Sequence, residues 1–209
     1  LFRSWTGACA ASVTDECSLT MSQARSVSAV FAVETHSITV TTPSDGTITG
    51  LGIACPGDCT ESYAYGTSVT LAATPATGYS FGTWSGACSG AIANCTILID
   101  GNKSVSATFT KNSYALTVTT PNNGTITSDV GGISCGATCS ATYDYPTSVT
   151  LTATASTGST FTGWSGEGCS GTGTCVVSMT QARNVTATFT LNTYALTVTR
   201  PGTGSGSVA

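Results

Sequence analysis

The sequence predicts an all-β protein made of tandem modules of about 80 residues, arranged as a linear rod. Three observations support this prediction. Val, Ile and Thr recur at alternating positions, which favours strands. Gly, Pro, Asn and Ser interrupt the chain at short intervals, as turns require. Aromatic residues return at a regular spacing, which indicates that one structural unit is repeated.

The repeat is clearest in the tryptophans. Trp5, Trp84 and Trp164 lie about 80 residues apart. The segment SITVTTPSDGTIT (37–49) returns as ALTVTTPNNGTIT (115–127). This period divides the chain into the C-terminal part of a repeat (1–33), two complete repeats (34–111 and 112–191) and the N-terminal start of a further repeat (192–209). We therefore expect a processed chain or a fragment, a window on a longer array.

Each element of the second repeat follows from alternation bounded by turn residues. The predicted strands are 114–119, 125–128, 140–145, 148–155, 161–165, 175–179 and 184–190. In them, apolar residues such as Val149 and Leu151 alternate with Thr or Ser, so one face is expected to be buried and the other to face water. The segments PSDG (43–46) and PNNG (121–124) place a glycine where left-handed backbone angles are favourable, which predicts a first hairpin. A short helix after the third strand is the alternative for this part of the repeat.

The low charge of the chain excludes several classes of protein. Six Lys and Arg stand against ten Asp and Glu, which gives a net charge of −4. This balance provides no basic surface for nucleic acid or for an anionic membrane. No run approaches the roughly 18 apolar residues that a transmembrane helix needs. The apolar content of 40% is enough for a folded core, so we expect a folded domain rather than a disordered chain.

All ten cysteines have a near neighbour in the sequence and a counterpart in another repeat. Comparison of the repeats predicts the local disulfides Cys9–Cys17, Cys55–Cys59, Cys88–Cys95, Cys135–Cys139 and Cys169–Cys175. Disulfides persist in oxidising compartments, so we expect a secreted or cell-surface protein. A structural zinc site, with the four cysteines of one repeat as ligands, remains an alternative.

Residues that could carry chemistry are scarce. The one histidine, His36, occupies the position that Tyr114 holds in the next repeat, so it is expected to be a half-exposed strand residue and not a catalytic base. No carboxylate is shared by the two complete repeats, which argues against a repeated calcium site and against a paired-carboxylate glycosidase. We predict no enzymatic activity, no catalytic residue, no metal and no cofactor.

Aromatic side chains provide the one ligand signal. Trp84 and Trp164 lie in FGTWSG and FTGWSG, and the tyrosines form two pairs, Tyr63 with Tyr65 and Tyr143 with Tyr145. Flat aromatic faces can stack on sugars. The alternative for the tryptophans is that they anchor the core of each module beside the neighbouring disulfide. The alternate spacing of each tyrosine pair places both rings on one face.

The segments YALTVTTPNNGTITS, CGATCSATYDYPTSVTLTATASTGSTFTGWSG, CSGTGTC and NVTATF resemble the divergent internalin B-type B-repeat, in a disulfide-bearing form. The resemblance covers essentially the whole chain, although LFRSWTG at the start departs from the pattern. It implies a small, β-grasp-like module strung in tandem on large secreted or surface-attached bacterial proteins, and it supplies no catalytic residues.

Two functions remain open at this point. The first is a disulfide-stiffened stalk, adhesin spacer or extracellular filament, whose partners are neighbouring repeats of the same chain and, through exposed strand edges, further copies of the chain in fibres. The alternative is a carbohydrate-binding module that uses Trp or Tyr faces to hold a glycan.

Overall fold

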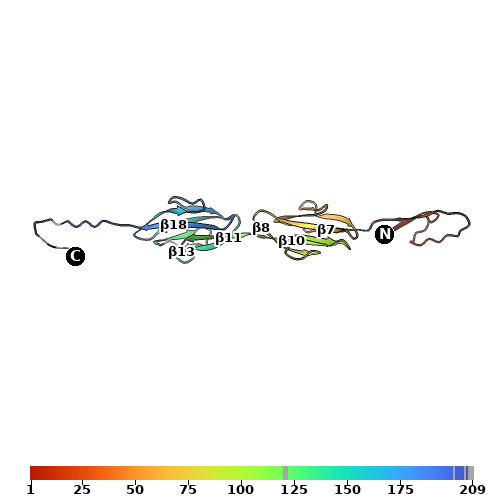
Figure 1. Cartoon of the computed structure of the whole chain (residues 1–209), viewed down its shortest axis with the longest axis horizontal. Coiled ribbons are helices and arrows are strands. Elements are labelled where there is room, and N and C mark those ends of the chain that lie inside the picture. Colours follow the sequence, from red (N-terminus) through yellow and green to blue (C-terminus); the bar gives the residue numbers. More distant parts are fainter. Residues whose placement is uncertain (120–121, 200, 205, 207–209) are drawn as a thin grey trace. The chain divides into compact units, whose positions relative to one another are not determined.

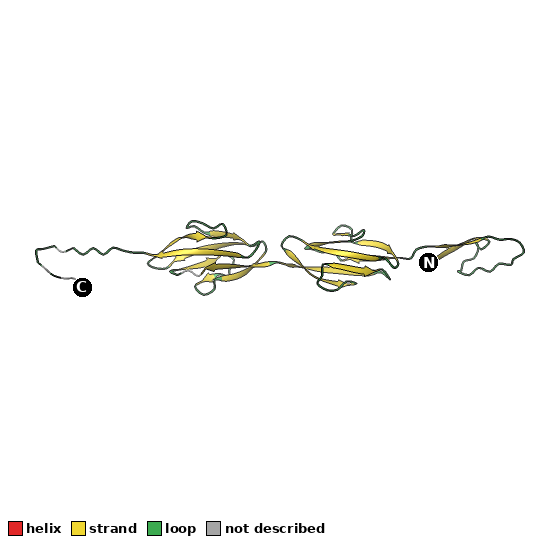
Figure 2. Ribbon diagram, in the orientation of Figure 1, coloured by secondary structure: helices red, strands yellow, loops and turns green. Residues whose placement is uncertain are grey.

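The computed structural model describes residues 1–119, 122–199, 201–204 and 206 of the chain of 209 residues. The described residues form strands and connecting segments without a helix (Figures 1 and 2). The predicted fold class, all-β with tandem repeats of about 80 residues, is confirmed. The chain divides into two compact units, Leu1–Asn112 and Ser113–Ala209, and each is described by itself.

The first module (residues 34–111) is a sandwich of two four-stranded sheets. Its strands are β3 (Thr35–Val40), β4 (Gly46–Thr49), β5 (Ala54–Cys55), β6 (Thr60–Ala64), β7 (Ser68–Pro75), β8 (Tyr79–Gly86), β9 (Asn94–Leu98) and β10 (Lys103–Lys111). One sheet has the order β6-β3-β10-β8 and the other the order β5-β4-β7-β9. The first and last strands of the module, β3 and β10, are therefore neighbours in the middle of one sheet, where they run parallel.

The core of the first module lies between its two sheets. Ile38, Val40 and Val105 project from one sheet, Ile48 and Leu71 from the other, and all five side chains are buried in one cluster. The residues between them in these strands are mostly Ser and Thr and face outward. The strands form because this alternation of period two matches the pleat of a half-buried sheet.

The second module (residues 112–191) repeats this architecture. Its strands are β11 (Ser113–Thr119), β12 (Gly124–Ser128), β13 (Ser134–Cys135), β14 (Ser140–Asp144), β15 (Ser148–Ala155), β16 (Ser159–Ser165), β17 (Cys175–Ser178) and β18 (Arg183–Leu191). The sheet orders are β14-β11-β18-β16 and β13-β12-β15-β17, again with the first and last strands parallel at the centre. All seven strands predicted for this repeat are present, and the two-residue β13 is an addition that the sequence did not predict.

The segment PSDG does not form the hairpin that the sequence predicts. β3 and β4, on either side of it, belong to different sheets, so the turn carries the chain from one layer of the sandwich to the other. Gly46 does not have a positive φ. A Cβ at this position would lie 2.5 Å from the ring of Phe109, so close packing is what requires glycine here. Part of the second predicted turn, PNNG (121–124), lies outside the described residues.

The strand order of the first sheet is compatible with the β-grasp-like module that the resemblance implies, since the first and last strands are central and parallel. The sequence left open a short helix after the third strand of each repeat, and the part of the chain that the structure describes does not have it. In each module the second layer is a four-stranded sheet over the described residues.

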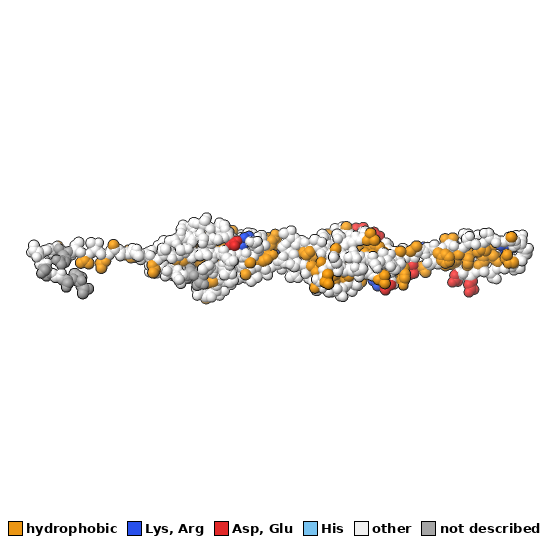
Figure 3. Space-filling model, in the orientation of Figure 1, with side chains coloured by type: hydrophobic (Ala, Val, Ile, Leu, Met, Phe, Trp, Pro, Cys, Tyr) orange, Lys and Arg blue, Asp and Glu red, His pale blue; other side chains and the backbone are white. Residues whose placement is uncertain are grey.

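Residues 1–33 form the N-terminal hairpin, in which β1 (Phe2–Gly7) pairs antiparallel with β2 (Val27–Phe31). These strands correspond to β8 and β10 of the first module. Hydrophobic side chains gather over this hairpin in the space-filling view (Figure 3). Phe31 of β2 is 71% exposed. At the other end of the chain, residues 192–199 follow β18 and are not in a strand.

Candidate functional site

A bulge in one strand of each copy explains the spacing of the F-x-x-W motif. In a regular strand, two residues three positions apart face opposite sides of the sheet. Between Phe81 and Trp84 the register of β8 against β10 shifts by one residue, which turns both rings to the core. Their ring centroids are 5.6 Å apart. The same irregularity separates Phe161 from Trp164 in β16.

Each tryptophan belongs to a group of three aromatic rings. Phe109 of β10 completes the group around Phe81, with 6.1 Å between ring centroids in an edge-on arrangement. In the second module Phe189 completes the group around Phe161, with 5.1 Å between ring centroids in a tilted arrangement. The N-terminal hairpin has the corresponding group, formed by Phe2 and Trp5 of β1 and Phe31 of β2. The sequence motif therefore encodes a packing unit that all three copies share.

The indole of each tryptophan also holds a loop closed by a disulfide. Nε1 of Trp84 donates a hydrogen bond to the carbonyl oxygen of Ile92 at 2.9 Å, inside the loop between Cys88 and Cys95. Nε1 of Trp164 donates to the carbonyl oxygen of Gly173 at 2.7 Å, inside the loop between Cys169 and Cys175.

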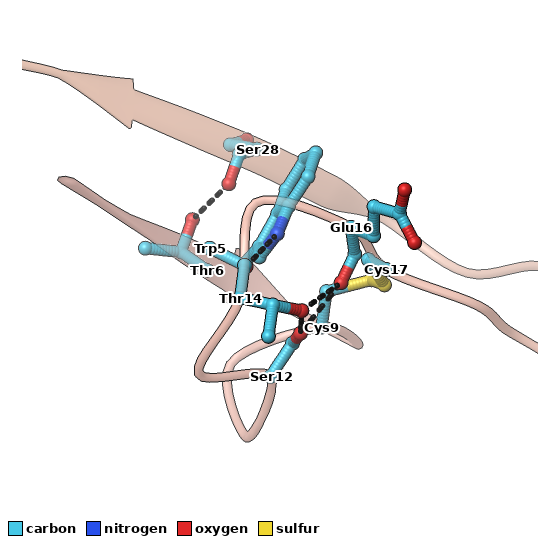
Figure 4. The surroundings of a disulfide bond; sticks show 8 residues. All are labelled: Trp5, Thr6, Cys9, Ser12, Thr14, Glu16, Cys17 and Ser28. Atoms are coloured by element: carbon cyan, nitrogen blue, oxygen red, sulfur yellow. Dashed lines mark hydrogen bonds between the residues drawn. A yellow bond between two sulfur atoms is a disulfide. The ribbon is translucent and has the colours of Figure 1, made fainter. Parts of the chain in front are cut away.

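The N-terminal hairpin repeats this arrangement, as Figure 4 shows. Nε1 of Trp5 donates to the carbonyl oxygen of Thr14 at 3.1 Å, within the loop that Cys9 and Cys17 close. The hydroxyls of Ser12 and Thr14 both donate to the carbonyl oxygen of Glu16. We call the tryptophan with its disulfide-closed loop the indole clasp.

The structure contains the five disulfides that the sequence predicts, Cys9–Cys17, Cys55–Cys59, Cys88–Cys95, Cys135–Cys139 and Cys169–Cys175. No cysteine is free, so none of them offers the thiolate that a structural zinc ion needs. The described residues also contain no group of three or more His, Cys, Asp or Glu that could hold a metal ion.

Two disulfides join the sheets of each module at opposite edges. Cys55 lies in β5 of one sheet, and Cys59 immediately precedes β6 of the other. At the far edge Cys88 follows β8, and Cys95 lies in β9. Because β5 and β6 are edge strands, as are β8 and β9, the sandwich is closed covalently on both sides. The second module has the corresponding pairs.

The tryptophans do not provide a surface for stacking on a ligand. Trp84 is 3% exposed and Trp164 is 5% exposed, so neither indole has a face open to solvent. The physical reason is that the bulge turns them inward, where the N–H is satisfied by the disulfide-closed loop. Of the two interpretations of the tryptophans, the structure supports the core anchor and contradicts the ligand contact.

The tyrosines of each pair lie in different surroundings. Tyr63 is buried, and its hydroxyl donates to the carbonyl oxygen of Leu51. Burial raises the pKa of Tyr63, and the nearby carboxylates Glu61 and Asp58 raise this pKa further. Tyr143 is likewise buried, with its hydroxyl 2.6 Å from the carbonyl oxygen of Gly131.

The second tyrosine of each pair follows the end of its strand. Tyr65 is 59% exposed, whereas Tyr145 is half-buried. The ring of Tyr65 lies edge-on to that of His36, with centroids 6.1 Å apart. Nε2 of His36 lies 3.1 Å from a carboxylate oxygen of Glu34. His36 is half-buried at the start of β3. Tyr65 is therefore the most exposed of the predicted stacking residues.

Charged side chains are sparse on the surface and make local contacts. Figure 3 shows few of them on the visible face. Lys103 pairs with Asp100 in the first module, and this contact lowers the pKa of the Asp100 carboxyl. In the second module Nη1 of Arg183 lies 2.5 Å from Oε2 of Glu167. Among the described residues, no helix has the length and hydropathy to cross a membrane.

Solved structures that resemble this chain include two proteins of low sequence identity. The Bacillus anthracis TIE protein is 9% identical, with a TM-score of 0.43, and the match covers 79% of this chain and 36% of that one. GBS52, the minor pilin of the gram-positive pathogen Streptococcus agalactiae, is 7% identical, with a TM-score of 0.27, and the match covers 79% of this chain and 99% of that one. This chain thus spans about a third of the length of the TIE protein. Among curated proteins the comparison found no match.

A protein-family model, described as the divergent InlB B-repeat domain, matches the chain twice in tandem, over residues 36–113 and 114–193. These ranges start and end two residues after the boundaries predicted from the repeat period. Together they cover both sandwiches, including the parallel central strands, the bulge and the four disulfides of the modules. The chain belongs to the divergent InlB B-repeat domain family.

Proposed function

We propose that this chain is a structural repeat region of a secreted or surface-attached bacterial protein, in which disulfide-closed modules are strung as a stalk or spacer. The observation that carries the proposal is the use of the recurring motif residues. In each sandwich the tryptophan, both phenylalanines and all four cysteines pack in the core or close the edges of the sheets. The recurring residues therefore stabilise the module, as expected for a structural repeat.

The junction between the modules supports the same proposal. A single residue, Asn112, separates β10 from β11. Its backbone N–H donates to the carbonyl oxygen of Gly78 at 2.8 Å, and its side-chain oxygen accepts from the hydroxyl of Ser80 at 2.6 Å. Asn192 makes the corresponding contacts after the second module, with Gly158 and Thr160. A junction this short and this well anchored gives little slack, which favours a stiff linear array.

The location and the shape can be tested separately. An antibody against this chain should label intact cells of the source bacterium, and labelling only after lysis would contradict a surface role. Electron microscopy of the chain should show rods of even width. Freely jointed beads would contradict a stiff stalk while leaving the surface location standing.

Self-association into fibres is part of the same proposal. The outer edges of the sheets carry few lysines, the side chain that most often blocks pairing between edges. Concentrated protein should therefore form larger species with a rising mean mass in light scattering. A constant monomer mass over the whole concentration range would remove this part of the proposal.

The carbohydrate-binding alternative is best supported at Tyr65, whose exposed ring lies beside His36 and near Glu34. An exposed aromatic ring beside polar groups suits stacking on a sugar. A glycan array should give a signal that is lost in Tyr65→Ala and kept in Tyr63→Phe if this alternative holds. No signal with the unmodified chain would remove it.

A further inference from the structure

The way in which the chain enters and leaves each module bears on how the module responds to tension. In the first module the chain enters through β3 and leaves through β10. These strands pair parallel in the register Ile38 with Lys103, Thr39 with Ser104 and Val40 with Val105. The start of β3 and the end of β10 therefore lie at opposite ends of the paired region.

Tension along the chain acts on this pair in a definite direction. A pull on the two ends of the module draws β3 and β10 past each other along their own length. The hydrogen bonds of a ladder lie across the strands, so such a pull loads them together. A pull on the same end of both strands would instead open the bonds one after another. The first geometry is shear, and the second is unzipping.

Several contacts reinforce the strands that carry the load. The backbone N–H of Thr41 donates to the carbonyl oxygen of Val105 at 2.9 Å and extends the ladder beyond the end of β3. On its other side, Val40 donates to the carbonyl oxygen of Cys59 at 2.8 Å, which fixes β3 to the β6 edge. The side chains of Val40 and Val105 are buried, so water has no access to the bonds from the core side.

The disulfides lie outside this path of load. Cys55–Cys59 and Cys88–Cys95 link the edges of the two sheets and do not cross-link β3 to β10. They hold the layers of the sandwich together while the central strands carry the force. The disulfide-closed loops are short, with sequence separations of 4 and 7 residues, so most of the module remains able to extend.

The second module has the same design. β11 and β18 pair parallel from Leu116 with Arg183 to Thr119 with Thr186. The hydroxyls of Thr119 and Thr186 lie 3.1 Å apart, and Val118 donates to the carbonyl oxygen of Cys139 at 2.8 Å. The arrangement is thus a property of the repeat and not of one copy.

We propose that each module is a mechanical clamp that resists tension along the chain through shear of its parallel first and last strands. The proposal deepens the stalk function and rests on it for its biological use, but it fails separately. A clamp in a protein that is absent from the cell surface would overturn the stalk alone, and a module that yields easily under tension would overturn the clamp alone.

Single-molecule force spectroscopy on the full chain tests the clamp by changing the direction of the pull. Azide-bearing residues placed at Val33 and Lys111 attach the handles for shear of the first module, since both positions are exposed. Moving the second handle to Gly101 gives unzipping, because that residue precedes β10 at the end where β3 starts. A side chain at Gly101 would meet nothing within 4 Å.

We expect rupture in the unzipping geometry at less than about half the force needed in shear, because forced unfolding follows the barrier to unfolding along the direction of loading. The shear event is recognised by its extension, which should grow by about 30 Å when the two disulfides are reduced. Reduction releases the chain between the paired cysteines at ~3.6 Å per residue, in place of the Cα–Cα spans of 4.7 and 6.0 Å across the bridges. Equal rupture forces in the two geometries would overturn the proposal.

A substitution gives an independent test with the second module as internal control. Thr41→Pro removes the N–H that donates to Val105 and leaves the ladder of β11 and β18 intact. With the chain held at its two ends, we expect the unfolding force of the first module to fall and that of the second module to stay unchanged. Two unchanged forces would contradict the clamp. If the first module of this variant does not fold, the comparison of rupture forces between the shear and unzipping handle positions still tests the clamp.

Discussion

Phe81 and Trp84 lie three residues apart in β8, yet both rings point into the core of the first module, with centroids 5.6 Å apart. The extra residue in the bulge between them makes this possible. The consequence reaches beyond packing, because the inward turn of Trp84 places its N–H against the carbonyl oxygen of Ile92. The bulge, the indole and the disulfide-closed loop therefore act as one unit.

Loss of the indole should destabilise a module strongly. Trp84→Phe removes the hydrogen bond to Ile92 and leaves a cavity, so we expect the free energy of unfolding of the first module to fall by about 2 to 4 kcal/mol. Urea unfolding followed by hydrogen exchange, which resolves the two modules, measures the change. The exposed Tyr65→Phe variant is the control and should unfold like the unmodified chain. An equal loss in both variants would contradict the role of the clasp.

Removal of one edge disulfide should weaken its own module. Replacing both Cys88 and Cys95 by Ser is expected to cost the first module about 2.5 kcal/mol on the chain-entropy estimate for a loop of this length. The shorter Cys55–Cys59 loop should cost about 2 kcal/mol by the same estimate. Calorimetry should then show one lowered transition and one unchanged transition from the second module.

The disulfides themselves are checked by mass. The oxidised chain should be lighter than the reduced chain by two hydrogens for each bridge, and digestion should recover the pairs within single repeats. Free thiols in the purified protein, or bridges between different repeats, would contradict the covalent closure of the sandwiches.

Gly46 should tolerate no side chain, because a Cβ there would lie 2.5 Å from the Phe109 ring and 2.7 Å from the carbonyl oxygen of Thr74. We expect Gly46→Ala to destabilise the first module by about 1 to 3 kcal/mol, the usual cost of overpacking. Gly101→Ala is the matched control, since the space around Gly101 is open and its φ is not positive. Thermal unfolding compares the two, and similar midpoints would show that the close packing at Gly46 is unimportant.

Asp129 should make the second module sensitive to acid. The backbone N–H of Thr150 donates to its carboxylate at 2.8 Å, and this bond lowers the pKa of Asp129 below the ordinary value of 3.8. The carboxylate therefore stabilises the fold above pH 3.8, and this contribution is lost as the pH falls through the lowered pKa. Asp129→Asn keeps an acceptor oxygen without the charge.

The measurement is the urea midpoint of the second module as a function of pH. We expect the midpoint of Asp129→Asn to depend less on pH below 3.8 than that of the unmodified chain. The first module should respond identically in both proteins and serves as the reference. If the urea midpoint of the second module depends on pH equally in Asp129→Asn and in the unmodified chain, Asp129 has no such role.

The sequence predicted much of the fold because the relevant signals are local. Alternation of period two identified the strands of the second module, including β15 at its observed bounds, and the paired cysteines lie close enough in the chain to meet without knowledge of the fold. The turn at PSDG shows the limit of such signals. Its residues predict a change of direction, but they do not say whether the next strand joins the same sheet or the other one.

Tertiary structure decided which of the candidate ligand residues are buried and which are exposed. Tyr63 and Tyr65 have the same residue type and nearly the same position, yet one is buried against Leu51 and the other is exposed. The odd spacing of Phe81 and Trp84 was the available signal for the bulge, since a regular strand would place them on opposite faces. That signal would have favoured the core anchor over the ligand contact for tryptophan.

The six letters YALTVT show most directly what the sequence determined and what it did not. At residues 114–119 they lie within β11, where β14 and β18 flank them and Leu116 is fully buried. At residues 194–199 the same letters form no strand, and Leu196 is exposed. The sequence by itself determined the repeat, the alternation and the local disulfide pairs. Tertiary structure alone decided which strands are neighbours, because the hydrogen bonds and the burial that stabilise a strand come from partners far away in the chain.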